Sequence, residues 1–188
     1  MNVSMQRLAE SLSLSPGNLT YHFPKKADLM LAIYDRFQEE MLAIIPTPDK
    51  NRPSLVGLNH QMDQFFQLQQ RFLFFYLDLL EIERAYQEIA QRHFRHIERQ
   101  INAIHQSLAY NSNMEYLRKR EESNYRYLAE QIWFTAVFWP KQCLVRGIEN
   151  QPEEMKKTIW HQIKPFLTEK GMEEFKNLNR QLAEHENI

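Results

Sequence analysis

Apolar residues return every three or four positions along most of this chain, and prolines and short polar segments interrupt the pattern. Over residues 27–45 this spacing predicts one long amphipathic helix, and the prolines of residues 46–53 end it. Beyond the prolines the same periodicity predicts six further helices, over residues 55–69, 70–82, 83–110, 116 or 123 to 146, 152–167 and 172–185. The pattern therefore indicates a protein built from helices.

Composition strengthens this interpretation. There are only four glycines in 188 residues, strong helix formers dominate, and runs of β-branched residues are nearly absent. We expect Gly147 to close one helix and Gly171 to separate the last two, while Pro140 falls inside a helix and should kink it. The sequence thus predicts an all-α protein with an N-terminal domain of residues 1–45 and a helical C-terminal domain of residues 54–188.

Residues 15–26, SPGNLTYHFPKK, contain the start of a short helix and the entry to the next one. Ser15 can cap that short helix and Pro16 suits its first position, where no backbone donor is needed. Upstream, Ser4 can cap a helix that runs through Leu12. Two short helices joined by almost no loop predict a helix-turn-helix, whose second helix presents its first residues to the major groove of DNA. The expected core of this unit is Leu8, Leu12, Leu19 and Phe23.

In order and spacing, this segment resembles the TetR/AcrR family of transcriptional regulators. The resembling positions are Ser4, Leu8, Ala9, Leu14, Ser15, Gly17, Leu19, Tyr21, His22, Phe23, Lys26 and Leu29. The remainder of the chain agrees with the family only in length and helical character. The resemblance implies a DNA-reading head, a long connecting helix over residues 27–45 that transmits ligand occupancy, and a C-terminal domain that binds an effector.

Several residues of the second short helix are candidates for contacts with double-stranded DNA. Because Gly17 has no side chain, the backbone at this position can approach a phosphate or a base edge closely. Gly17 could also be an ordinary helical residue. Asn18 can pair with adenine or contact phosphate, and Thr20 can reach phosphate or a thymine methyl group; both could equally form a solvated face. The expected DNA-contacting residues are Ser15, Pro16, Gly17, Asn18, Thr20, Tyr21, His22, Lys25 and Lys26.

The resemblance favours phosphate contacts for Tyr21 and Lys26, and a packing or orienting role for His22. The sequence also departs from the family. Thr20 replaces a common aromatic residue, and Lys25 stands where a small capping residue is usual, which should weaken the start of the next helix.

The family's head also opens with a further helix that packs on the other two, whereas this sequence starts at Met1, just before the second. Two explanations stay open. The start is internal to a longer reading frame, which the intact motif favours, or the reading head is degenerate. Without that helix, apolar side chains of the head would lose a cover.

Aromatic residues are concentrated in two stretches of the C-terminal domain, residues 65–76 and 133–139. Core packing is the ordinary interpretation for any one of them, but such a bundle also suits an apolar or amphipathic effector. Asp78 could orient that effector, or could be an exposed residue or the partner of Arg84. The candidate pocket consists of Phe72, Phe75, Tyr76, Asp78, Leu79, Trp133, Phe134 and Phe138.

The helices over residues 123–146 and 152–167 resemble the pair through which family members dimerise. A homodimer also suits the mechanism, because one short reading helix contacts few bases, whereas two copies can read a palindrome.

Other functions find little support. With a net charge of −1 the protein as a whole is not basic, so any DNA affinity must come from a local surface. The single cysteine, Cys143, excludes an internal disulfide. No leader or membrane-length apolar run occurs, so we expect a cytoplasmic protein with no membrane contact. His93 and His96 share a helix face but lack further ligands at suitable spacing, so no metal and no cofactor is expected. No catalytic motif stands out.

We therefore expect a ligand-responsive transcriptional repressor and not an enzyme. The alternative is a helical sensor that dimerises and binds ligand but has lost DNA binding.

Overall fold

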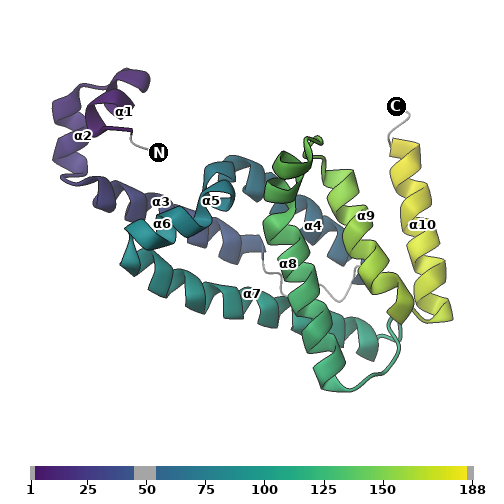
Figure 1. Ribbon diagram of the computed structural model, residues 1–188. Coiled ribbons are helices and arrows are strands. Elements are labelled where there is room, and N and C mark those ends of the chain that lie inside the picture. The colour runs from purple at the N-terminus through teal and green to yellow at the C-terminus, as the bar shows by residue number, and fades with distance from the viewer. Residues whose placement is uncertain (1–2, 45–53, 186–188) are drawn as a thin grey trace.

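The computed structural model describes residues 3–44 and 54–185, which form ten α-helices and one 3-10 turn (Figure 1). The all-α prediction is confirmed. The helices are α1 (Met5–Ser11), α2 (Pro16–His22), α3 (Lys26–Ile44), α4 (Ser54–Arg71), α5 (Leu73–Leu77), α6 (Leu79–Ala85), α7 (Gln87–Asn113), α8 (Glu122–Arg146), α9 (Pro152–Ile163) and α10 (Glu169–His185). Among the residues described, no helix is both long and apolar enough to cross a bilayer.

A small head made of α1 and α2 projects from one end of the molecule, and α3 leads from it into the helical body (Figure 1). In the body, α7 packs along α8, and α9 contacts both α8 and α4. The last helix, α10, lies against α4 at the end opposite the head, where Phe175 packs on Trp160 of α9. The head is therefore positioned through α3.

Two apolar clusters form the core of the body. The larger one joins α4, α8, α9 and the second half of α7 around residues such as Leu108, Met155 and Ile163, all of them fully buried. The smaller one is rich in aromatic rings and joins α3, α5, α6 and the first half of α7. Because the second half of α3 belongs to this smaller cluster, the connecting helix is anchored in the body. The proposed domain boundary, residues 46–53, lies outside the described residues.

The prediction of a single helix over residues 70–82 is wrong, because the chain bends twice there. It leaves helical geometry at Phe72 (φ −111°, ψ 30°) and at Asp78 (φ −109°, ψ 18°), which separate α4, α5 and α6. Nearly all side chains of this stretch are apolar, and a straight helix would turn some of them outward. The bends instead direct Phe72, Phe75 and Leu79 into one core.

The two glycine predictions had different outcomes. Gly147 closes α8 in the left-handed conformation with φ +64°, as expected. Gly171 does not separate two helices but lies inside the first turn of α10. A Cβ atom there would sit 2.0 Å from the carbonyl oxygen of Tyr116, so the close approach of two backbones explains this glycine.

Candidate nucleic-acid interface and effector region

Both short helices of the head begin at the serine caps predicted from the sequence. The Ser4 hydroxyl accepts a hydrogen bond from the Arg7 backbone N–H at 3.2 Å, and the Ser15 hydroxyl accepts one from Asn18 at 3.1 Å. Pro16 occupies the first turn of α2. Local capping therefore fixes where the second helix starts.

The first residues of α2 face solvent while one apolar side chain anchors the helix. Leu19 is only 6% exposed. The exposed residues of this segment are Ser15, Pro16, Gly17, Asn18, Thr20, Tyr21 and His22. The Tyr21 ring meets the edge of His22 at a centroid distance of 5.2 Å. The predicted contact residues thus form one accessible surface.

Gly17 has no structural need to be glycine within the described chain. A Cβ atom placed there would meet nothing within 4 Å among the described residues, and its φ angle is not positive. Glycine in a helix is less favourable than alanine by about 1 kcal/mol. The open space in front of Gly17 is therefore available to an external partner.

The start of α3 is better capped than the sequence suggested. We expected Lys25 to weaken this helix start, but the Asp28 carboxylate accepts a hydrogen bond from the Lys25 backbone N–H at 2.9 Å. The acidic residue in the first turn thus satisfies a free amide in place of a small capping side chain. Lys25 is exposed and Lys26 half-buried, and both lie at the start of α3, shortly after α2 ends.

The predicted core of the head is only partly correct. Leu19 is buried, and Leu8 and Phe23 are half-buried, but Leu12 is 61% exposed. The reason is that α1 ends at Ser11, so Leu12 follows the last helical turn and leaves the packed face. Together with Leu14, also exposed, it gives the head an apolar surface.

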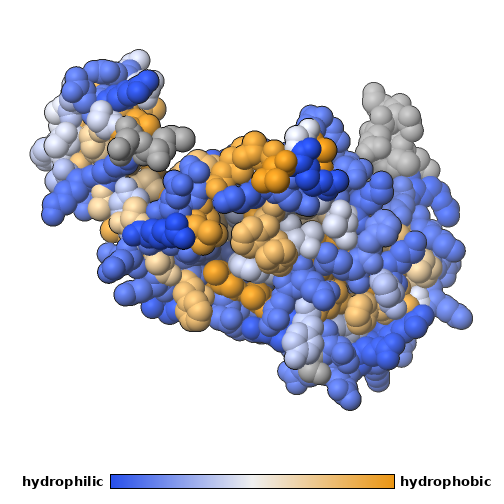
Figure 2. All heavy atoms as spheres, in the orientation of Figure 1, coloured by the Kyte–Doolittle hydropathy of each residue, from blue (hydrophilic) through white to orange (hydrophobic). Residues whose placement is uncertain are grey.

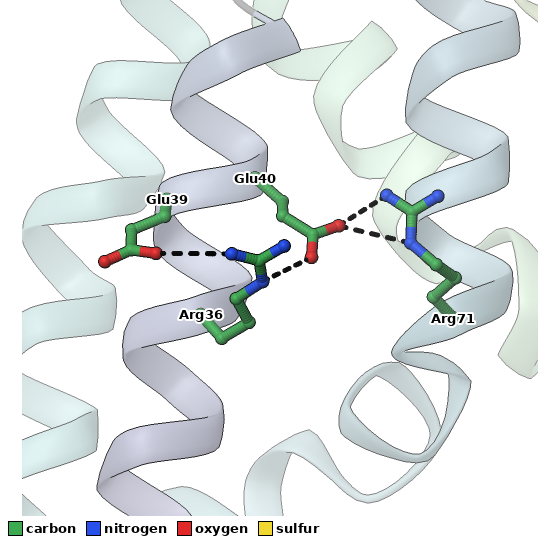
Figure 3. Close-up of polar contacts among 4 residues, drawn as sticks. All are labelled: Arg36, Glu39, Glu40 and Arg71. Atoms are coloured by element: carbon green, nitrogen blue, oxygen red, sulfur yellow. Dashed lines mark hydrogen bonds and ion pairs between the residues drawn. The ribbon is translucent and has the colours of Figure 1, made fainter.

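The connecting helix is held in the body by apolar and charged contacts. Tyr34, Phe37 and Met41 lie on one face of α3 and are buried in the aromatic cluster. On a flanking face, Glu40 accepts hydrogen bonds from Arg71 at the end of α4 and from Arg36 one turn earlier in α3 (Figure 3). The hydrogen bond from Arg71 holds the pKa of Glu40 below its usual value.

A second ion pair joins α3 to α7, where Arg92 binds Asp35 and its guanidinium lies 5.7 Å from the centre of the Tyr34 ring. Charged contacts to α4 and to α7 thus accompany the buried face of the connecting helix. Neither these two ion pairs nor the anchoring role of Tyr34 and Phe37 was predicted from the sequence. Spacing along the chain does not reveal which distant residues come into contact.

The structure brings only part of the predicted pocket together. Phe72, Phe75, Tyr76 and Leu79 are buried in the aromatic cluster, where side chains of α3 already fill the space between them. Trp133 is half-buried and packs against both core clusters, and Phe138 packs against the smaller one.

Phe134 and Asp78 do not belong to this buried group. Phe134 is 60% exposed and stacks on Phe138 at 4.8 Å, on the outer face of α8. Its direction follows from helix geometry, because Trp133 and Val137 face inward. Asp78 is half-buried at the junction of α5 and α6, where its carbonyl accepts hydrogen bonds from Glu81 and Ile82.

Two histidines that the sequence offered only as weak metal ligands line the cluster instead. His93 Nδ1 lies 2.8 Å from the Glu83 carboxylate, and burial lowers the pKa of His93 while that carboxylate opposes the shift. Burial also lowers the pKa of His96 to about 4. In the described part of the chain, no three potential ligands gather as a metal site.

Comparison with known proteins places the chain in a family. The sequence profile of the TetR family, described as "Bacterial transcriptional repressor", matches residues 36–175. The chain belongs to the TetR family. This match begins inside the connecting helix, so it is independent of the N-terminal motif. As a TetR-family transcriptional repressor the protein is a DNA-binding regulator and not an enzyme. Among curated proteins, none matches the sequence significantly.

Solved structures share the TetR fold. A TetR-family transcriptional regulator from Marinobacter aquaeolei VT8 superposes with a TM-score of 0.87 at 19% identity, over 96% of this chain and 88% of that one. A TetR transcription regulator from Haloarcula marismortui ATCC 43049 gives 0.69 at 15% identity, over 89% and 88%. A transcriptional regulator from Cytophaga hutchinsonii ATCC 33406 gives 0.60 at 14% identity, over 89% of each chain.

Proposed function

We propose that this TetR-family repressor binds a palindromic operator as a homodimer, and that a small apolar or amphipathic effector bound in its body alters the spacing of the two heads. DNA reading is assigned to residues 1–45, and effector binding and dimerisation to residues 54–188. The observation that carries the proposal is the bare leading end of α2, with open space at Gly17.

Base reading is assigned to the start of α2. Pro16, Gly17, Asn18 and Thr20 all face solvent, as a helix that enters the major groove requires. The amide of Asn18 and the hydroxyl of Thr20 supply groups that can reach base edges or phosphates. The Thr20 hydroxyl donates to the Pro16 carbonyl at 2.8 Å. A hydrogen bond from Thr20 to phosphate would replace this one, while the Thr20 methyl group stays available for a thymine methyl group.

Phosphate contacts are assigned to Tyr21, Lys25 and Lys26, with Ser15 at the start of the reading helix and His22 in a packing or orienting role. Such contacts fix the position of a protein on the duplex without reading sequence. The head carries little net positive charge, since Glu10 and Asp28 offset Arg7 and the two lysines. Affinity then depends on these few positions, and each should matter measurably.

Dimerisation is assigned to the outer face of α8, with α9 beside it. Large apolar side chains lie exposed there: Tyr127, Phe134, Leu144 and Val145, with Ile148 just beyond the helix. Figure 2 shows apolar residues gathered over α5 and α8. A groove of about 600 Å³ beside Phe134 is lined by Tyr127, Trp133 and Gln162. An apolar surface of this kind favours a second copy of the chain over water.

The alternative, a sensor that no longer binds DNA, draws support from the exposed Leu12 and Leu14 on the head. A fluorescence anisotropy titration distinguishes the two proposed functions. The full chain is titrated against labelled duplexes from the DNA upstream of its own coding region. Unlabelled random DNA serves as the competitor. A repressor binds one duplex at least about 10³-fold more tightly than random DNA. Equal affinity for all duplexes would favour the sensor.

A further inference from the structure

Phe37 of α3 occupies the centre of the aromatic cluster. Its side chain is 1% exposed and is surrounded by five rings at centroid distances of 4.9 to 6.0 Å. These rings belong to Tyr34, Phe72, Phe75, Tyr76 and His96. Because Phe37 lies on the connecting helix, whatever takes the place of this ring also changes how α3 is held.

Two of the rings that contact Phe37 each carry a buried polar atom with no hydrogen-bond partner in the described part of the chain, the Tyr76 hydroxyl and His96 Nε2. Both rings lie 5.9 Å from the Phe37 ring and meet it at steep angles, 82° and 66°. An unpaired buried polar group is costly and rare in native proteins. Two of them around one side chain indicate a site that receives its partner from outside.

The site suits a neutral ligand. Burial lowers the pKa of His96 to about 4, so the imidazole is uncharged at neutral pH and one ring nitrogen can accept a hydrogen bond. Burial also raises the pKa of Tyr76, so its hydroxyl keeps its proton. Nearby, His93 is already paired with Glu83. Arg99 also acts on His96 but is exposed. None of the five rings around Phe37 carries a charge that could compensate a desolvated charged ligand.

Resting on the proposed function, we propose that the effector belongs to the phenol class. Its ring takes the place of the Phe37 side chain, and its hydroxyl donates to His96 Nε2 and accepts from the Tyr76 hydroxyl. Phe37 swings out when the ligand binds, which removes the central buried contact of α3. The head is then held less firmly and its operator affinity falls.

The first test needs no ligand and compares two buried tyrosines by thermal unfolding of the full chain. Tyr76 is 5% exposed and its hydroxyl has no partner among the residues that the structure describes, whereas Tyr125 is 3% exposed and its hydroxyl donates to the Arg118 carbonyl. Tyr76→Phe should raise Tm by about 2 to 4 °C, and Tyr125→Phe should lower it by a similar amount. A fall in Tm for Tyr76→Phe would mean that its hydroxyl is satisfied internally, and would overturn the site.

The second test uses Phe37→Ala, which leaves a ring-sized space against the rings of Tyr76 and His96. Phenol and toluene have nearly the same shape, and a purely apolar cavity prefers the apolar ligand. In calorimetric titrations, Phe37→Ala should bind phenol at least about tenfold more tightly than toluene. Adding Tyr76→Phe or His96→Phe should abolish that preference. Equal or tighter binding of toluene by Phe37→Ala would overturn the proposal.

If Phe37→Ala fails to fold, Phe37→Leu provides a smaller space for the same comparison. Specific DNA binding by the unmodified, ligand-free chain is measured separately. Absence of specific DNA binding by this chain would contradict the proposed function. Intact DNA binding without a preference of Phe37→Ala for phenol would contradict only the phenol site.

Discussion

Glu40 of the connecting helix accepts two hydrogen bonds from Arg71 of α4, at 3.1 Å from Nε and 2.5 Å from Nη2 (Figure 3). The contact joins the helix that carries the head to the body. Arg36 donates to the other carboxylate oxygen at 2.7 Å, so Glu40 is held from both helices. Because the head is positioned through α3, this contact helps to set the direction in which α2 points.

Arg71→Ala should therefore weaken operator binding without changing the oligomeric state. Loss of the contact lets α3 sample more orientations, and we expect operator affinity to fall about fivefold, within the usual range of coupling between sites. Anisotropy titrations measure the affinity. Glu39→Gln is the matched control, because among the described residues Glu39 pairs, at 3.7 Å, only with Arg36 of the same helix. An equal loss in both variants would show that the contact with α4 has no special role.

Lys26→Gln should weaken binding to all DNA sequences alike. A phosphate contact carries no sequence information, and its removal lowers the slope of log K against log salt by about 0.9. Titrations at several salt concentrations measure this slope for operator and random duplexes. Lys119→Gln, an exposed lysine remote from the head, should leave it unchanged. A change in sequence preference for Lys26→Gln would instead assign this residue to base reading.

The local features of the head could be predicted from the sequence because they depend on neighbouring residues. Ser4 and Ser15 cap helices through contacts three residues away, and the order and spacing around Gly17 carry the resemblance to the family. The all-α fold follows from periodicity in the same way. Leu12 was misjudged because its burial depends on where α1 ends, which periodicity places only to within a turn.

The effector region was less predictable because its packing is tertiary. The sequence placed Phe72, Phe75 and Tyr76 in one candidate pocket, but it did not show that Phe37 of α3 inserts among them. Helical spacing likewise could not show that Phe134 points away from the cluster. Burial of His96 next to Phe37 depends on the same long-range packing, so its unpaired nitrogen could not have been anticipated.

Acid should destabilise the fold over a window set by His96. Its pKa is about 4 in the folded protein and 6.5 when unperturbed, because burial disfavours the charged form. Between these values the unfolded chain binds more protons, so stability is complete above pH 6.5 and falls as the pH drops to 4. The loss amounts to about 3 kcal/mol at most.

Urea unfolding between pH 4 and 7 measures this dependence. His96→Phe should make it shallower, and the remainder belongs to His93, whose pKa burial also lowers. His60→Gln, on the exposed face of α4, should leave it unchanged. Retention of the full slope in His96→Phe would assign the acid sensitivity to other groups.

Phe134→Glu should prevent formation of the proposed dimer. A charge at the centre of the exposed apolar stripe of α8 cannot be buried against a second copy without a partner. Sedimentation velocity should then show a monomer, and operator affinity should fall because two linked heads are lost. Phe94→Glu is the control, since Phe94 is similarly exposed but lies on α7. A Phe134→Glu variant that stays dimeric would place the interface elsewhere.

Operator binding by Gly17→Glu tests the central claim most directly, because the Gly17 position is open within the described chain and α2 should fold as well or better. Anisotropy against the operator, with sedimentation as the folding and assembly control, should show specific binding lost and the dimer intact. Specific binding retained by a dimeric Gly17→Glu protein would contradict the assignment of α2 as the DNA-reading helix.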